Sequence, residues 1–223
     1  DAHGLHSIIT ESAERAADLA QKLLTCSHSQ PTATTRLNAQ QAVDDALGLL
    51  RLIVDKRIQI ETDFSAKTSR VVGSHADLQS AFLNLGINAS HAMPDGGLLS
   101  VRSTTVHFDA EYCATSAFNL APGEFLELVV SDTGSGIAPE NLSRVFEPFF
   151  STKFVGRGLG LAAIQGIVRS HKGRVAVESE LGRGTTFTVY LPAVSEPVSS
   201  ASDSGEPVAD SDVPKTILLV DDE

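Results

Sequence analysis

Apolar residues near the start of the chain recur with a helical period. Their spacings are 4, 3, 4 and 3 residues, and charged side chains lie between them. These residues are Ile9, Ala13, Ala16, Ala20 and Leu23. The spacing is typical of a helix that presents an apolar seam to another helix, although an amphipathic helix packed on its own domain shows the same pattern.

Between about Leu37 and Pro192, helical and strand periods alternate. The pattern predicts helices over 39–54, 74–93 and 159–171, strands over 58–63, 98–106, 125–130, 174–179 and 185–191, and a loop over 108–123. Because most of the strands follow the early helices, we expect an α+β fold, a two-layer sandwich of helices on a sheet, rather than a doubly wound parallel sheet.

The end of the chain differs in composition from the rest. Of the 22 residues over 193–214, 6 are Ser, 3 are Pro and 5 are acidic, which predicts a flexible linker. Residues 215–220 then resemble a buried strand, and three acidic residues follow it. We therefore expect five segments: a helical segment 1–30, a connector 31–36, a folded domain 37–192, the linker 193–214 and the beginning of a further domain at 215–223.

The formal net charge of −11 indicates that neither nucleic acid nor an anionic membrane is a partner. Most of this charge lies at the end of the chain: residues 193–223 hold 8 acids and 1 base, which leaves 20 acids and 16 bases elsewhere. Cys26 and Cys113 lack metal-ligand spacing, so we expect structural thiols in a reducing compartment. No membrane-spanning stretch or signal peptide is visible. We expect a cytoplasmic location, and the sequence does not determine whether a parent protein has a membrane anchor upstream.

The predicted helix over 74–93 carries a polar stripe beside its apolar side. Asn84, Asn88 and His91 fall within about 60° of one another when successive residues are placed 100° apart. An amide oxygen can coordinate Mg²⁺, and an imidazole can contact a phosphate oxygen. Solvent-facing polar residues would produce the same stripe, so this helix alone leaves both interpretations open.

Two glycine-rich segments follow. Asp132 comes just after a predicted buried strand and precedes Gly134 and Gly136, which places a carboxylate beside bare backbone that a ligand can approach. Residues 156–161 (Gly-Arg-Gly-Leu-Gly-Leu) directly precede a helix, where N–H groups can approach phosphates. The segment is neither a P-loop nor a dinucleotide-binding motif, and the motifs of ordinary protein kinases are absent.

Taken together, four segments resemble the ordered boxes of sensor histidine kinases. Residues 83–89 resemble the N box, 132–136 the first glycine box, 146–150 the F box and 156–161 the second glycine box. Residues 184–192 resemble the closing hairpin of that family. The resemblance covers about 37–192 and implies a Bergerat-type ATP-binding domain, with a mixed and mostly antiparallel sheet under helices and one long helix before it. It also implies ATP and Mg²⁺ as cofactors.

The resemblance assigns roles to the matching polar residues. Asn88 would hold the Mg²⁺ that bridges the triphosphate, and Asp132 would accept a hydrogen bond from the adenine amino group. Asn84 and His91 would lie near the phosphates. Thr185 would support Asp132 through its hydroxyl.

The glycine boxes and the segment between them receive the remaining roles. Gly134 and Gly136 would give the base room. Lys153 and Arg157, in a presumed lid, would bring positive charge to the phosphates. The second glycine box would contact the nucleotide through Gly156, Gly158, Leu159, Gly160 and Leu161.

One departure from the wider superfamily concerns the reaction. In its ATP-hydrolysing branches, the position four residues before the Mg²⁺-binding Asn is Glu, whereas here it is Asn84. An amide is not a base, so we expect γ-phosphoryl transfer to a histidine rather than to water. An ATPase or serine kinase of the same superfamily remains an alternative, as does a non-enzymatic, nucleotide-gated docking module.

The acceptor histidine is expected on a helical hairpin ahead of the ATP domain. His3 and His6 lack the acidic neighbour typical of a phosphoacceptor, and residues 8–24 better resemble the second helix of that hairpin, with the first helix upstream. Residues 215–223 resemble the opening of a receiver domain, which indicates a hybrid histidine kinase. The expected partners are the phosphoacceptor helix, a receiver domain or response regulator, and a second copy of the parent protein. This chain alone should bind ATP without phosphorylating itself.

Overall fold

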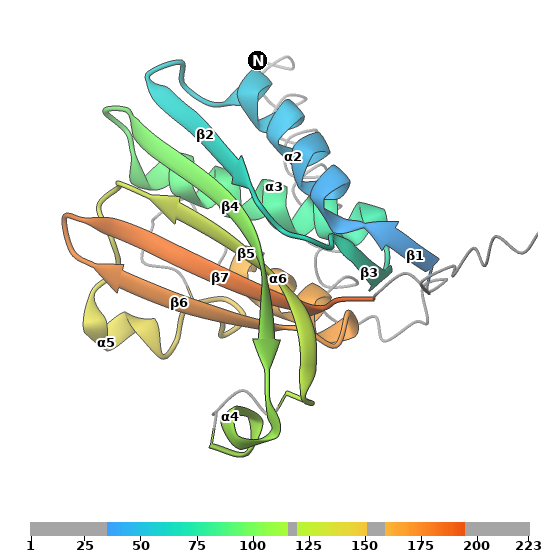
Figure 1. Cartoon of the computed structure of the whole chain (residues 1–223). Helices are drawn as coiled ribbons and strands as arrows, with labels where there is room; N and C mark the ends of the chain where they lie inside the picture. The colour runs from blue at the N-terminus through green and yellow to red at the C-terminus, as the bar shows by residue number, and fades with distance from the viewer. Residues whose placement is uncertain (1–34, 116–119, 151–158, 195–223) are drawn as a thin grey trace, which may run out of the picture.

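A computed structural model describes residues 35–115, 120–150 and 159–194 (Figure 1). In chain order, the elements are β1 (Thr35–Asn38), α2 (Ala39–Ile53), β2 (Ile58–Phe64), β3 (Arg70–Gly73), α3 (His75–Ala92), β4 (Gly97–Phe108), α4 (Ala110–Thr115), β5 (Gly123–Asp132), α5 (Pro139–Leu142), α6 (Gly160–Ser170), β6 (Arg174–Glu180) and β7 (Gly184–Pro192). All the predicted helices and strands in these ranges are confirmed, and their ends differ by at most two residues.

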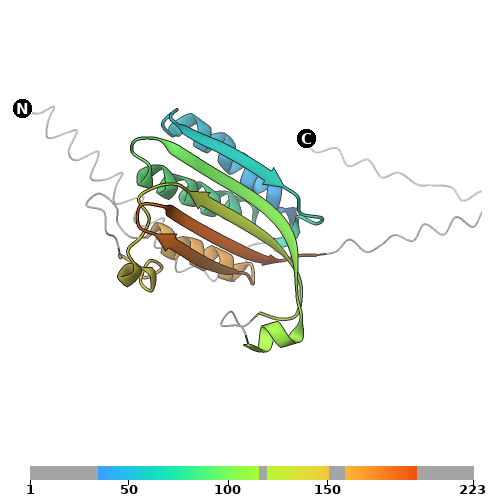
Figure 2. The ribbon, with the colours of Figure 1, turned by 60° about the vertical axis from the view of Figure 1, so that its left-hand side comes forward.

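Five strands form one sheet in the order β2-β4-β5-β7-β6. β2 pairs parallel to β4, whereas the other three pairs are antiparallel. Figure 2 shows α2, α3 and α6 on one side of this sheet, and none of the described helices covers its other side. The predicted α+β sandwich with a mixed, mostly antiparallel sheet is therefore confirmed.

The side chains of β5 alternate between the two faces of the sheet. Leu126, Leu128 and Val130 are buried on the face that the helices cover, because successive residues of a strand point in opposite directions. Val129 and Ser131 alternate with Leu128, Val130 and Asp132 along the strand and are only half-buried. One face of the sheet thus belongs to the main hydrophobic core, and the other has a mixed, partly polar surface.

Helices α2 and α3 each bury one apolar side. Residues of α2 at helical spacing, from Ala39 to Leu50, pack in the same core as Leu78, Phe82 and Leu85 of α3. The side chain of Ser74 caps α3 by accepting a hydrogen bond from the Asp77 N–H, at 3.3 Å. The apolar side predicted for this helix is confirmed.

Four short elements were not predicted: α4, α5, β1 and β3. The predicted loop over 108–123 contains α4, which lies where β4 and β5 extend away from the other strands (Figures 1 and 2). Beside it, Phe108, Leu120 and Phe125 form a second, small apolar cluster. β1 and β3 form a two-stranded antiparallel sheet, and β1 begins inside the expected connector 31–36. Strands of four residues are too short to produce a clear alternation in sequence, and pairing with a distant strand stabilises them.

Several predictions concern residues outside the described ranges. These are the seam helix, the presumed lid with its two basic residues, the linker 193–214 beyond its first two residues, and the segment 215–223. Within the described ranges, no helix is long and apolar enough to cross a membrane.

Candidate functional site

Asp132 is the last residue of β5 and lies on the helix-covered face of the sheet. Its side chain is almost fully buried, with 7% of the residue surface exposed. Carboxylate Oδ1 accepts hydrogen bonds from the N–H groups of Gly134, at 2.9 Å, and Thr185, at 3.3 Å. Thr185 stands opposite Asp132 in the β5–β7 ladder. The strand pair and the first glycine box therefore hold this carboxylate in one orientation.

Thr185 reaches Asp132 through its main-chain N–H, whereas the hydroxyl was predicted to do so. The Thr185 hydroxyl lies 2.9 Å from Ser179 Oγ of β6. Ser179 Oγ also donates to the Gly184 carbonyl and accepts from the Ile137 N–H, both at 2.8 Å. Because Ser179 has a single O–H, which the Gly184 carbonyl takes, Thr185 is the donor in their contact. Sequence reasoning missed Ser179, and no motif marks it.

The first glycine box packs tightly between α3 and the β6–β7 turn. A Cβ at Gly134 would lie 2.6 Å from the Ala92 carbonyl oxygen, and a Cβ at Gly136, where φ is +68°, would overlap the Glu180 carbonyl. The Ser135 N–H donates to Ala92 at 2.9 Å. These close contacts explain why both positions are occupied by glycine, since a larger side chain would collide with neighbouring backbone. Room for a base at these glycines stays a prediction.

The polar stripe of α3 lies next to the start of α6. Asn84 and Asn88 are half-buried, and His91 is exposed. A Cβ at Gly160, the first residue of α6, would lie 3.8 Å from Asn88 Nδ2, which is ordinary contact distance. The structure thus brings the N box and the second glycine box together, although their residues are far apart in sequence. A helix N-terminus with unpaired N–H groups is suited to an anion.

Only part of the second glycine box can be described. Leu159 is buried at the N-cap of α6, and Leu161 packs against the main core. Their side chains are therefore structural, and only their main-chain N–H groups are suited to phosphate. The predicted contacts at Gly156 and Gly158, and the charges at Lys153 and Arg157, lie outside the described residues.

The F box contributes one half-buried residue that packs against the core and one exposed residue. The ring of Phe146 packs edge-on against Phe187 of β7, with centroids 6.4 Å apart. Phe149 is 64% exposed, with a φ of +68°. The Arg144 guanidinium lies 4.4 Å from the centroid of the Phe150 ring. Phe146 thereby anchors this segment beside the sheet strand that carries Thr185.

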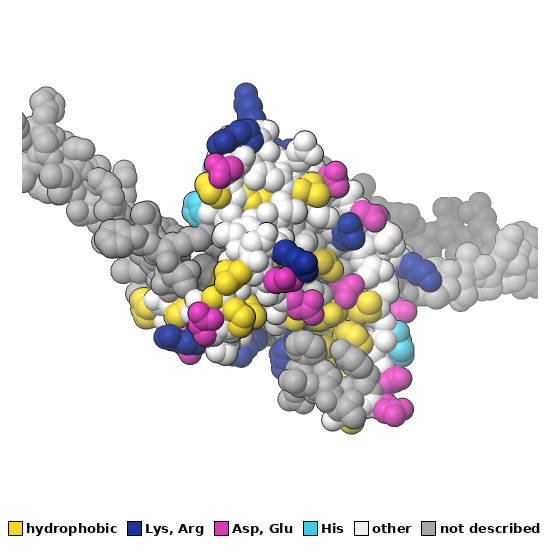
Figure 3. All heavy atoms as spheres, turned by 90° about the vertical axis from the view of Figure 1, so that its left-hand side faces the viewer, with side chains coloured by type: hydrophobic (Ala, Val, Ile, Leu, Met, Phe, Trp, Pro, Cys, Tyr) yellow, Lys and Arg dark blue, Asp and Glu magenta, His cyan; other side chains and the backbone are white. Residues whose placement is uncertain are grey.

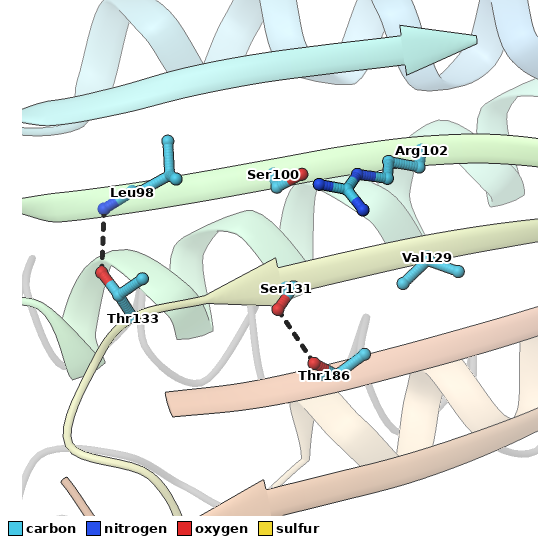
Figure 4. A pocket seen from close by; sticks show the side chains of 7 residues that line it. All are labelled: Leu98, Ser100, Arg102, Val129, Ser131, Thr133 and Thr186. Carbon is cyan, nitrogen blue, oxygen red and sulfur yellow. Dashed lines mark hydrogen bonds between the residues drawn. The ribbon is translucent and has the colours of Figure 1, made fainter. Parts of the chain in front are cut away.

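The opposite face of the sheet carries a groove of about 340 Å³ (Figure 4). Its lining residues come from β4, β5, β7 and the residue after β5: Leu98, Ser100, Arg102, Val129, Ser131, Thr133 and Thr186. None of the predicted site residues lines it. Because Asp132 points to the covered face, the sheet separates its carboxylate from this groove. The groove is therefore distinct from the candidate nucleotide site.

The described residues offer few ligands for a resident metal. No group of three His, Cys, Asp or Glu side chains within the described ranges could hold a metal ion. The face of the molecule seen in Figure 3 likewise shows acidic side chains interspersed with basic ones among the described atoms, rather than a cluster of acids alone. Mg²⁺ commonly uses one or two protein oxygens together with phosphates and waters. A single Asn88 amide beside the N-terminus of α6 fits that kind of binding.

Comparisons with known proteins agree with this arrangement. Residues 73–195 match the family model described as "Histidine kinase-, DNA gyrase B-, and HSP90-like ATPase". The sensor kinase CckA of Brucella abortus is 33% identical over 224 residues, covering 96% of this chain and 24% of CckA. The mycobacterial sensor histidine kinase MprB matches at a TM-score of 0.58 and 28% identity, over 72% of this chain and 98% of that structure. Full-length ShkA, solved with AMPPNP, matches at 0.65 and 23% identity, over 87% of this chain and 40% of that structure.

The chain belongs to the family of histidine kinase-, DNA gyrase B- and HSP90-like ATPases, because the family model covers more than half of its residues. Within that family, it contains the ATP-binding catalytic domain of a sensor histidine kinase. The resemblance inferred from the four boxes is therefore confirmed. The chain spans only about a quarter of the length of the CckA relative.

Proposed function

We propose that this domain holds Mg²⁺-ATP and donates its γ-phosphoryl group to a histidine on a separate helical hairpin of the parent protein. The observation that carries the proposal is the buried Asp132 carboxylate, which two main-chain N–H groups orient. A carboxylate can accept from an exocyclic amino group as well as from its own backbone, since its two oxygens offer about four acceptor positions. Asp132 would thereby recognise adenine.

The triphosphate would lie between α3 and α6. Asn88 would coordinate Mg²⁺ through its amide oxygen, and the first-turn N–H groups of α6, beginning near Gly160, would donate to phosphate oxygens. Asn84 and His91 would lie along the same side of α3. The metal, when bound, would neutralise phosphate charge. Lys153 and Arg157 would add positive charge, and Gly156 and Gly158 further N–H donors.

Transfer to histidine is favoured over hydrolysis by the side chain at position 84. Asn84 lies one helical turn before Asn88 and has no basic group with which to activate water. The acceptor would come from the upstream hairpin, whose second helix we assign to residues 8–24. A receiver domain or response regulator would take the phosphoryl group next. The parent protein would act as a homodimer, with this domain in the cytoplasm.

Calorimetric titration with ATP, with and without Mg²⁺, tests the nucleotide and metal assignments. Asn88→Ala should weaken binding in the presence of Mg²⁺ and have little effect when Mg²⁺ is chelated. Ser80→Ala, an exposed position on the same helix two turns away, is the matched control. Equal losses in both conditions would remove Asn88 from the metal. A hundredfold excess of ATP over its Kd should stabilise the fold by ~2.7 kcal/mol. No change in melting temperature at millimolar ATP would contradict the site itself.

The reaction is tested by adding a polypeptide that carries the complete phosphoacceptor hairpin. Incubation with labelled ATP and Mg²⁺ should produce acid-labile, base-stable phosphate on that polypeptide, as expected for phosphohistidine. Phosphate release by this chain alone would favour the ATPase alternative. Binding of ATP without transfer or hydrolysis would favour a docking module.

A further inference from the structure

His171 is a buried histidine that no part of the proposed chemistry uses. It caps the C-terminal end of α6, and only 6% of its surface is exposed. Its Nδ1 lies 2.8 Å from the Ile167 carbonyl oxygen, and its Nε2 accepts a hydrogen bond from the Ser74 N–H at 2.9 Å. Only a neutral ring with its proton on Nδ1 makes both contacts, because a carbonyl needs a donor and an N–H needs an acceptor.

These contacts join the end of α6 to the beginning of α3. Ser74 is the N-cap of α3, so the N–H that His171 holds belongs to the residue that starts the helix. The residue before it, Gly73, lies directly against the ring, and a Cβ there would overlap ring atoms Cδ2 and Nε2. The imidazole therefore fits closely against this part of the backbone, and its position leaves little freedom to either helix end.

The two helices run in opposite directions, with the candidate phosphate site at their other ends. Ser74 lies near His171 at one end, and Asn88 lies near Gly160 at the other. At 1.5 Å per residue, Asn88 is about 21 Å along α3 from Ser74, and Gly160 is about 16 Å along α6 from His171. A helix transmits an axial shift along its length, so a shift at the His171 end would move Asn88 relative to the α6 N-terminus.

Apolar packing alone does not set this register. Between the two ends, α6 contributes Ile164, Ile167 and Val168 to the core. Hydrophobic burial is non-directional, and packed helices can slide against each other over small distances. A buried hydrogen bond has a defined distance and direction, and it is costly to leave unmade. The His171 contact thus supplies a directional constraint between α3 and α6.

We propose that His171 is a positioning residue for the triphosphate. By accepting the Ser74 N–H, it sets the axial register of α3 against α6 and thereby the separation between Asn88 and the N-terminus of α6. The proposal rests on the assignment of those two features to Mg²⁺ and phosphate. It makes no claim on the adenine end, because Asp132 is held by β5, β7 and the first glycine box.

Two substitutions of similar size separate the contacts of the two ring nitrogens. In His171→Gln, the terminal amide reaches the position of Nε2 and can accept the Ser74 N–H. In His171→Asn, the shorter amide lies near the position of Nδ1 and can donate to the Ile167 carbonyl, but it cannot reach Ser74. We expect the Asn variant to bind Mg²⁺-ATP about tenfold more weakly, as for the loss of one hydrogen bond, and the Gln variant to stay within about threefold of the unaltered chain.

Adenosine, which lacks phosphates, distinguishes positioning from a general structural defect. Its affinity, followed by NMR titration, should be unchanged in both variants. Equal ATP affinity in the Asn variant and the unaltered chain, or a parallel loss of adenosine and ATP binding, would overturn the proposal. Failure of the unaltered chain to bind ATP would instead overturn the proposed function.

A second variant covers the case in which His171→Asn does not fold. In Gly73→Ala/His171→Ala, the added methyl group occupies part of the space that the ring leaves, so packing is partly restored without the hydrogen bond. This double variant should fold better than His171→Ala and still show weak ATP binding with normal adenosine binding. Normal ATP binding in the folded double variant would contradict the positioning role.

Discussion

The two faces of the five-stranded sheet are built from the same strands but differ in burial and in the residues that they present. On the covered face, Asp132 and Thr185 are buried and belong to the candidate nucleotide site. Their neighbours in sequence, Thr133 and Thr186, line the groove on the uncovered face. Because side chains alternate along a strand, a step of one residue leads from the buried Asp132 carboxylate next to α3 to the Thr133 hydroxyl in the groove on the other face. Among the described elements, only those on the covered face, α3 and α6, carry further candidate site residues: Asn84, Asn88 and His91 on α3, and Gly160 on α6.

The polar contacts on the two faces also differ. On the covered face, Asp132 and Ser179 each bond to main-chain groups of neighbouring segments. On the uncovered face, Ser131 and Thr186 form a pair of hydroxyls 2.9 Å apart, and the Thr133 hydroxyl accepts from the exposed Leu98 N–H at 3.0 Å (Figure 4). Burial makes a lost hydrogen bond more costly, so we expect the covered face to be much less tolerant of substitution.

The largest difference should appear between neighbours on β5. Leu128→Ala removes a side chain that is 0% exposed and should lower the free energy of unfolding by about 2–5 kcal/mol. Val129→Ala, on the half-buried face, should cost less than about 1 kcal/mol. Urea denaturation of the two variants measures both values. Equal losses would contradict the assignment of the core to one face.

Two glycines of the β6–β7 turn provide the next comparison. A Cβ at Gly184, where φ is +116°, would overlap the Asp132 carbonyl, whereas Gly182, where φ is +76°, has no atom within 4 Å of such a Cβ. Gly184→Ala should cost about 2–4 kcal/mol of stability through overlap and backbone strain together. Gly182→Ala should cost only the strain, about 1 kcal/mol. Thermal denaturation ranks the two variants, and a greater loss in Gly182→Ala would refute the close approach of β7 to Asp132.

Nucleotide binding should depend on the Asp132 carboxylate of the covered face and not on the Glu127 carboxylate of the uncovered face. In Asp132→Asn, the amide oxygen can keep the Gly134 and Thr185 contacts, but its NH₂ group would then face the adenine amino group, so that two donors meet. We expect ATP binding to weaken by about 1.5–3 kcal/mol, or about 10- to 150-fold. Glu127→Gln, which changes a carboxylate on the uncovered face, should leave the Kd unchanged in calorimetry. An unchanged Kd for Asp132→Asn would remove this residue from base recognition.

The smallest difference concerns two serines. Ser179→Ala would leave the Ile137 N–H without its acceptor and the Gly184 carbonyl without that donor, at a cost of about 1–2 kcal/mol. Ser131→Ala on the uncovered face loses only its contact with Thr186, where water can replace it, so the cost should be about 0.5 kcal/mol. Chemical denaturation measures both, and a larger loss at Ser131 would contradict the proposed difference between the faces.

The sequence determined the helices and strands that are long enough to show a clear helical or alternating pattern. The helices α2, α3 and α6 and the five strands of the main sheet were predictable because alternation and helical spacing report which side of each element is buried. The four-residue strands β1 and β3 and the short α4 were not, since their formation depends on distant contacts. Candidate site residues could also be identified from the sequence, because Asp132, Asn88 and the glycine boxes lie in motifs whose order and spacing resemble those of a known family, and their roles stay predictions.

Only the tertiary structure decided how these residues are held. The contact between Asp132 and Thr185 joins residues 53 apart, and the one between His171 and Ser74 joins residues 97 apart. Neither Ser179 nor His171 belongs to a motif. Both side chains bind main-chain groups, which every residue type provides except that proline lacks the N–H, so these partner positions carry no recognisable residue type. Side-chain types are readable along the chain, whereas the pairing of main-chain donors and acceptors from distant segments depends on how the sheet and helices pack.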